Sequence, residues 1–257
     1  KLVADYVGSN GLTAIFHNAG VVPSLPEKGP KHTKSLSVEV TPMETFRWVM
    51  EVEYFGTIAV TKAFLGLLEK SAATGRPARI VFNSDAKISV PYIGQVFGSL
   101  FAMDAVATAM RRELMEKGTG VDIIVMQPGA INTKSLTSVL DTAISAEFSD
   151  LYSMEKAHAE SFMEEAVKTG VSPQATSDDL VDAVLSLKPY TRYYPGFLAY
   201  AGFVVGHFFP DEWTDAFFAY NVRTREGKLS DPAWVEKARK MFSEEPLPIG
   251  MKRKSEL

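Results

Sequence analysis

Residues 79–129 limit the possible folds more than any other stretch of the sequence. Two short apolar runs, residues 79–82 and 121–126, end in residues typical of turns, and a segment with helical periodicity at residues 92–117 joins them. Short apolar runs connected by a helix predict a βαβ unit with a buried parallel sheet. Ligands of such folds bind beyond the carboxyl ends of the strands, so we expect the turns after both runs to border a site.

Two further elements precede this unit. Residues 12–16 are apolar and predict another strand. Thr41 and Glu44 have the spacing of a capping box, with Pro42 at the expected first helical position. They open a long amphipathic helix that we expect to end near Lys70. The alternation of strands and helices predicts an α/β fold.

The second half of the chain is expected to cover the site. We interpret residues 134–220 as an excursion over the substrate, with Ser177 capping a helix and residues 189–196 forming a last strand. Residues 1–245 then make up a single domain, and residues 246–257 form a flexible tail.

Charge and composition exclude several classes of function. The formal net charge is −4, with 27 basic and 31 acidic residues, which argues against a nucleic-acid partner. The chain has no cysteine, so neither disulfides nor thiolate metal sites are expected. The four histidines (His17, His32, His158 and His207) are scattered without the spacing of ligands, so we expect no metal centre.

An apolar, aromatic stretch at residues 196–206 leaves two interpretations open. It is shorter than the roughly 20 residues that a membrane span needs. One interpretation is a lid over a hydrophobic small molecule, and the other is contact of residues 196–209 with a membrane surface. Residues 254–257 are similar to an endoplasmic-reticulum retention signal but also fit an ordinary charged tail, so an endoplasmic-reticulum association and a cytoplasmic location both stay open.

Several short motifs follow one another along the chain. They are His17-Asn18-Ala19-Gly20 after the first predicted strand, residues 101–105 and 110–114 in the helix, and Pro128-Gly129 with Thr133 after the next strand. Together they resemble the short-chain dehydrogenase/reductase family over roughly residues 12–220. Residues 182–196 are similar to its retinol dehydrogenase and 17β-hydroxysteroid dehydrogenase branch. The resemblance implies a Rossmann-like parallel sheet flanked by helices.

The resemblance also implies NAD or NADP as the cofactor. Asn18 has a second interpretation, as a brace between strands. Gly20, Pro128 and Gly129 likewise have a second interpretation, as residues that form turns. Members of the family seat the pyrophosphate on a glycine-rich turn in a first βα unit. The chain begins at Lys1 in a helix-like segment, so we expect that unit to be missing upstream, which leaves residues 12–16 at a sheet edge. The expected cofactor contacts are Asn18, Ala19, Gly20, Pro128, Gly129 and Thr133.

The family's reaction needs a tyrosine to exchange a proton, a lysine one helical turn later to lower the tyrosine's pKa, a serine and an asparagine. Alignment on the motifs puts Val96 at the tyrosine position, Leu100 at the lysine position and Glu53 at the asparagine position. The serine position falls within residues 83–85, where only Ser84 keeps a hydroxyl. A carboxylate at Glu53 is costly in a partly buried cluster unless it is paired.

Two functions therefore remain as hypotheses. In the first, the chain keeps the scaffold without dehydrogenase chemistry and pairs with itself or a relative through the long helices at residues 41–70 and 92–117. In the second, it is an NAD(P)-dependent oxidoreductase of a hydrophobic alcohol or ketone, such as a retinoid or steroid, with Tyr92 as one candidate proton donor. Tyr152 and Lys156 have the tyrosine–lysine spacing but lie in the excursion, so we interpret them as a chance match.

Overall fold

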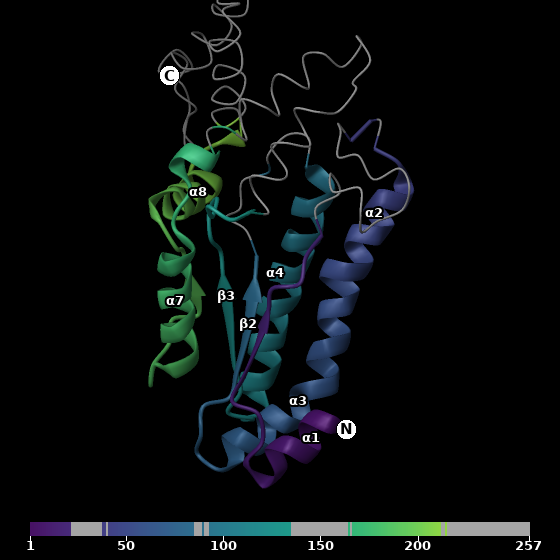
Figure 1. Cartoon of the computed structure of the whole chain (residues 1–257), viewed down its shortest axis with the longest axis vertical. Helices are drawn as coiled ribbons and strands as arrows, with labels where there is room; N and C mark the ends of the chain where they lie inside the picture. The colour runs from purple at the N-terminus through teal and green to yellow at the C-terminus, as the bar shows by residue number, and fades with distance from the viewer. Residues whose placement is uncertain are drawn as a thin grey trace, which may run out of the picture. The chain divides into compact units, whose positions relative to one another are not determined.

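Parallel strands form the sheet around which the chain is built (Figure 1). This computed structural model describes residues 1–21, 38–39, 41–84, 89, 93–134, 164, 166–211 and 214. The strand order is β1-β2-β3-β4, and each neighbouring pair is parallel, which confirms the predicted α/β architecture. The strands are β1 (Ala14–His17), β2 (Arg79–Asn83), β3 (Asp122–Met126) and β4 (Arg192–Tyr193).

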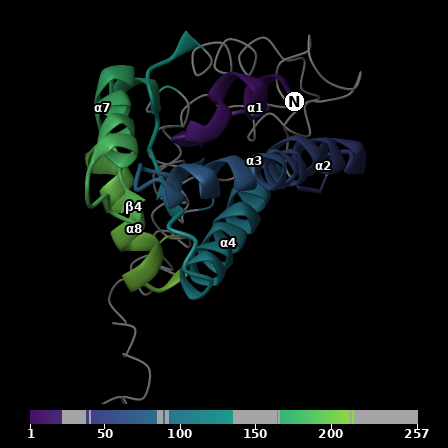
Figure 2. The same ribbon diagram turned by 90° about the horizontal axis from the view of Figure 1, so that it is seen from below.

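Helices cover both faces of this sheet (Figure 2). The chain divides into two compact units, Lys1–Phe203 and Val204–Leu257, and the sheet belongs to the first. Within that unit α3 and α4 pack on one face and α7 packs on the other. The helices are α1 (Leu2–Val7), the short 3-10 turn η1 (Gly8–Asn10), α2 (Met43–Val49), the π-helical segment η2 (Met50–Gly56), α3 (Thr57–Ala73), α4 (Gly94–Glu116), α7 (Pro173–Leu185) and α8 (Phe197–Phe208).

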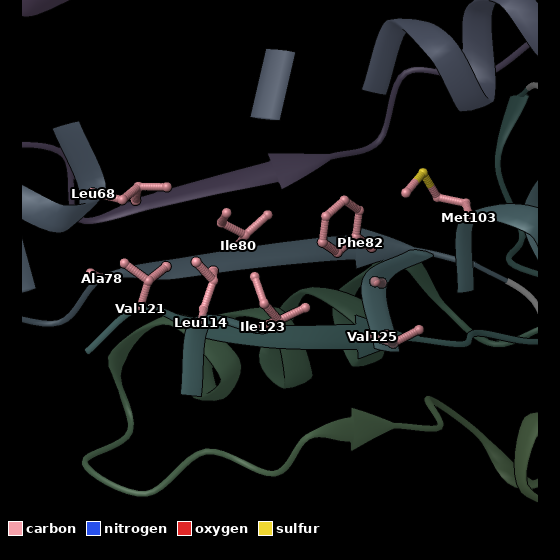
Figure 3. Packing of buried hydrophobic residues seen from close by; sticks show 10 residues of the cluster. Leu68, Ala78, Ile80, Phe82, Met103, Leu114, Val121, Ile123 and Val125 are labelled. Atoms are coloured by element: carbon pink, nitrogen blue, oxygen red, sulfur yellow. The ribbon is translucent and has the colours of Figure 1, made fainter. Parts of the chain in front are cut away.

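The core follows from the alternation of side chains along the buried strands. On β2, Ile80 and Phe82 pack in one cluster with Leu68 of α3 (Figure 3). Val81 points to the opposite face, where it packs in a second cluster with Ala183 of α7. This packing fixes α4 along the sheet and brings the beginning of α4 beside the carboxyl ends of the strands (Figure 1).

Within the described residues β1 pairs only with β2, so it lies at the predicted edge of the sheet. The chain enters β1 through Gly11, whose φ is 71°. The Leu12 N–H donates to Leu67 O of α3 over 2.8 Å, and a Cβ at Gly11 would lie 2.4 Å from the same oxygen. Only glycine permits this close approach of the entering chain to α3.

The helix predicted at residues 41–70 begins later and winds differently. Pro42 is the N-cap rather than the first helical residue, and no side chain caps the helix, so the predicted capping box does not form. The Pro42 carbonyl instead accepts from Thr45 N–H over 2.9 Å. The seven-residue segment η2 then separates α2 from α3. The prediction missed it because the same side-chain pattern fits a regular α-helix.

The beginning of α7 also corrects the prediction. The helix starts at Pro173 and is capped by Ser172, whose Oγ accepts from Ala175 N–H over 3.3 Å. Proline suits the first helical position because its φ is already fixed. Ser177 therefore lies inside the helix, where its hydroxyl donates to Pro173 O over 2.9 Å. The last strand, β4, is two residues long rather than spanning residues 189–196.

The apolar stretch predicted at residues 196–206 forms α8, on which Phe197 is 81% exposed. Among the described residues no helix is both long and apolar enough to cross a membrane. Contact of residues 196–209 with a membrane surface stays a prediction. Residues 135–163 of the predicted excursion and the tail at residues 246–257 lie outside the described part of the chain.

Candidate functional site

Two asparagines link the carboxyl ends of β1 and β2. Asn83 Nδ2 donates to Asn18 Oδ1 over 3.1 Å. Before them, His17 stacks on Phe82 with ring centroids 5.0 Å apart and shares a 2.8 Å hydrogen bond between its Nε2 and Thr61 Oγ1. Burial lowers the pKa of His17, which favours the neutral ring. This end of the sheet is therefore held together by uncharged polar contacts.

Glu53 lies beside this turn, in the middle of η2. Its side chain is only 7% exposed, as expected for a carboxyl group in a polar cluster. Glu53 Oε1 accepts from Val21 N–H over 3.1 Å, and Oε2 is hydrogen-bonded to Ser99 Oγ of α4. Burial raises the pKa of Glu53, while the hydrogen bonds with Ser99 and Val21 act in the opposite direction. Both oxygens of the carboxyl group thus have a partner within the protein.

Two aliphatic side chains stand one helical turn apart on α4. Val96 and Leu100 are both half-buried, and neither carries a side-chain donor or an ionisable proton. The buried Ser84 directs its hydroxyl to Leu100 O over 3.3 Å, and its N–H donates to Met126 O over 2.8 Å. Hydrogen bonds therefore connect Ser84 with Leu100, and Glu53 through Ser99 with Val96, near the beginning of α4.

The turn after β3 forms the other border of the site. Pro128 is buried, Gly129 is half-buried and Thr133 is exposed. The Thr133 N–H donates to Ile131 O over 2.8 Å, which closes a tight turn. Across the sheet Asn18, Ala19 and Gly20 are exposed at the end of β1. The six residues expected to contact a cofactor thus follow the carboxyl ends of β1 and β3, where ligands of such sheets bind.

An ion-pair cluster that the sequence analysis missed ties β4 to α4. Arg192 Nη1 donates to Asp104 Oδ1 over 2.6 Å and to Gln127 Oε1 over 3.1 Å, and Nη2 donates to Thr108 Oγ1 over 3.1 Å. Asp104 and Gln127 are both buried. Arg192 was part of a motif, but its acidic partner lies 88 positions away in the sequence, where no local pattern indicates it.

Some predicted residues cannot be placed. Asp85, Tyr92, Tyr152 and Lys156 lie outside the described residues. Within the described part, no group of three or more histidine, aspartate or glutamate side chains is arranged to hold a metal ion.

Comparison with known proteins gives the class of this protein. The family described as short chain dehydrogenase matches residues 2–143, and the chain belongs to that family. It lies near the steroid dehydrogenase branch. The chain is 29% identical to estradiol 17-beta-dehydrogenase 2 of Mus musculus over 227 residues, which cover 83% of this chain and 55% of that protein.

A second relative and two solved structures are also similar to this chain. The chain is 30% identical to 11-beta-hydroxysteroid dehydrogenase type 2 of Oryctolagus cuniculus, with coverage of 73% of this chain and 45% of that protein. The chain thus spans about half the length of these two relatives. A short-chain dehydrogenase from Streptomyces avermitilis aligns with a TM-score of 0.58 at 17% identity, covering 88% of this chain and 75% of its own. A short-chain dehydrogenase from Burkholderia cenocepacia, solved with NADP, aligns with a TM-score of 0.53 at 18% identity, covering 85% of this chain and 72% of its own. Both show the Rossmann-like fold.

Proposed function

We propose that this chain keeps the short-chain dehydrogenase scaffold without the proton-transfer chemistry of the family. The observation that carries the proposal is the pair of aliphatic side chains, Val96 and Leu100, one turn apart on α4 beside Ser84. Oxidation of an alcohol requires a group that takes the hydroxyl proton, and neither side chain can do so. Loss of such a positioned acid–base group costs about 10²–10⁴ in rate.

The remaining polar groups do not replace the missing pair. The Ser84 hydroxyl is directed to the Leu100 carbonyl, and Glu53 bonds to Ser99 and Val21. Both groups are therefore engaged within the protein. A substrate hydroxyl would have to displace one of these contacts before it could exchange a proton.

The nicotinamide cofactor of the family, when bound, accepts or donates a hydride. The turns after β1 and β3, with Asn18 to Gly20 and Pro128 to Thr133, would hold it. The residues at the nicotinamide end fit poorly, because Leu100 offers no donor to a ribose hydroxyl. We therefore propose that NAD and NADP bind weakly. Titration of the protein with NADH and NADPH, followed by cofactor fluorescence, measures this directly.

Restoring the two polar side chains tests the proposed loss of chemistry. We expect the wild-type protein to turn over estradiol or a matching ketosteroid about 10²–10⁴ times more slowly than an active relative assayed in parallel. The double variant Val96→Tyr with Leu100→Lys should be faster than the control variant Val96→Phe with Leu100→Met, which has similar bulk but no acid–base groups. Turnover by the wild-type protein at the rate of the relative would refute the proposal.

A second candidate function is oxidoreduction of a hydrophobic alcohol or ketone, and the similarity to estradiol 17-beta-dehydrogenase 2 and 11-beta-hydroxysteroid dehydrogenase type 2 favours it. Both are steroid dehydrogenases. This function needs a proton donor other than Val96, and Tyr92 is the sequence candidate. If the wild-type protein is active, the variant Tyr92→Phe tests this second function. Loss of activity in that variant assigns the proton transfer to Tyr92.

Pairing through the long helices is the partner interaction that we propose. Ala105 and Ala109 are exposed one turn apart on α4, and on the neighbouring helical run Phe55 is 53% exposed. Small exposed side chains let a second helix approach closely. We expect light scattering to detect an oligomer, or a complex with an active relative, that the variant Ala105→Arg with Ala109→Arg abolishes. The matched control is Val181→Arg, at an exposed position of α7 on the other face, which should leave the mass unchanged.

A further inference from the structure

Glu53 connects three segments that are distant in the sequence. It belongs to η2, its Oε1 accepts from Val21 N–H after β1 over 3.1 Å, and its Oε2 bonds to Ser99 Oγ of α4. Ser99 is fully buried and Glu53 nearly so. π-Helical segments such as η2 are rare and often lie at functional sites. The hydrogen bond between Glu53 and Ser99 is therefore buried, and it holds η2 against α4 beside the candidate site.

The hydroxyl of Ser99 has one proton and two neighbours that could receive it. Ser99 Oγ lies 2.7 Å from Val96 O, a carbonyl that can only accept. If Glu53 were ionised, its Oε2 would also only accept, and one proton would have to serve two acceptors. A neutral Glu53 removes this conflict. In that state the Glu53 proton would be donated to Ser99 Oγ, in place of the Ser99 hydroxyl donating to Oε2, the Ser99 proton would go to Val96 O, and Oε1 would still accept from Val21.

No opposite charge balances an ionised Glu53 among the described residues. Burial and the hydrogen bonds with Ser99 and Val21 are what act on the pKa of Glu53, and His17 at the end of β1 bonds to Thr61 instead. An uncompensated buried carboxylate is unfavourable. The charged side chains on the surrounding helices, none of which bonds to Glu53, are Glu44 and Arg47 on α2, Glu51 on η2, Lys62, Glu69 and Lys70 on α3, and Asp104, Arg111, Arg112, Glu113 and Glu116 on α4.

We propose that Glu53 is held as a neutral carboxylic acid in the folded protein, and that its proton closes a latch between residues 18–21 and α4 that opens when the proton is lost. The latch consists of Glu53, Ser99 and the Val21 N–H. An ionised Glu53 requires water, which it reaches by leaving Ser99 and releasing Val21. Access to the turn after β1 then depends on pH.

The folded state should lose stability through this group as the pH rises. The unfolded chain releases the Glu53 proton near the ordinary pKa of 4.5, whereas the folded chain keeps it to a higher pH. The stabilising contribution is complete below the unfolded-state pKa of 4.5 and is lost as the pH rises from there towards the raised pKa of the folded state. Over this window the unfolding equilibrium constant increases by up to about tenfold per pH unit. The variant Glu53→Gln, which is uncharged and can still donate to Ser99, should not show this change.

Two NMR measurements on the whole chain test the latch. In protein with ¹³C-labelled glutamate carboxyl groups, we expect the Glu53 signal to titrate above the ordinary glutamate pKa of 4.5. Amide exchange, corrected for the intrinsic effect of pH, should show Val21 losing protection across the same titration. The Leu12 amide, which bonds to Leu67 O at the other end of β1, is the control and should keep its protection.

Each outcome decides the proposal. Titration of Glu53 at or below pH 4.5 overturns it, as does a Val21 protection that stays constant through the titration. In Glu53→Gln the Val21 amide should remain protected at every pH, and pH-dependent loss of protection there would also overturn it. If that variant fails to fold, the titration of the wild-type carboxyl group is sufficient by itself.

Discussion

Replacing Gly11 with alanine is expected to lower the free energy of unfolding by about 4 kcal/mol, the sum of backbone strain and a steric collision. Gly11 has φ 71° and ψ −170°, a conformation that is essentially restricted to glycine. An added Cβ would lie 2.4 Å from Leu67 O and 2.5 Å from Ser71 N. Both are backbone atoms of α3, so they cannot move aside as a flexible side chain could. Urea unfolding measures the change.

Gly8 is the matched control for this substitution. It also has a positive φ, 56°, with ψ −131°, but an added Cβ would meet no atom within 4 Å. Gly8→Ala should therefore cost only the strain, about 1–2 kcal/mol. Equal losses in the two variants would mean that the contact between Gly11 and α3 does not contribute to stability.

Replacing Arg192 with methionine should be the second large effect, a loss of about 3 kcal/mol. The substitution removes hydrogen bonds to Asp104, Gln127 and Thr108. Asp104 is 7% exposed, so its carboxylate would lose its cation where water cannot replace it. The loss lies at the lower end of the range for buried ion pairs because Arg192 itself is 27% exposed. Thermal or urea unfolding provides the measurement.

A surface ion pair of the same chain is the control. Arg47 and Glu44 are 4.0 Å apart and both 72% exposed, so Arg47→Met should change the stability by less than about 1 kcal/mol. Adding Asp104→Asn to Arg192→Met should recover part of the loss, because the side chain that has lost its cation is then neutral. If the Arg192 and Arg47 variants lose the same stability, the cluster around Arg192 is no more important than a surface pair.

The sequence predicted the central βαβ unit because its signals are local. The apolar runs of β2 and β3 and the periodicity of α4 each lie within a few turns of the chain, and burial of both sheet faces follows from them. The winding of η2 and the capping of α7 were missed for a different reason. Their side-chain patterns fit more than one backbone, and Ser172 competes with Ser177 as a cap.

The candidate site was predicted in part for the same reason. Family spacing placed Glu53, Val96 and Leu100, but it could not indicate the partner of Glu53. That partner, Ser99, is 46 positions away, and the Arg192–Asp104 pair spans 88. Such pairs form only when the sheet and α4 are assembled. The protonation of Glu53 likewise depends on burial, which no local pattern in the sequence reports.

The widened segment η2 also affects how this helix tolerates insertions and deletions. A π-helical turn closes its hydrogen bond over five residues rather than four, so it holds one residue more than a regular α-helical turn. Deleting one residue from Met50–Gly56 should therefore be absorbed by regular α-helical winding, which keeps Thr57, Thr61 and Leu68 on the buried side of α3. The same deletion within α3 has no extra residue to remove and would rotate everything after it by about 100°.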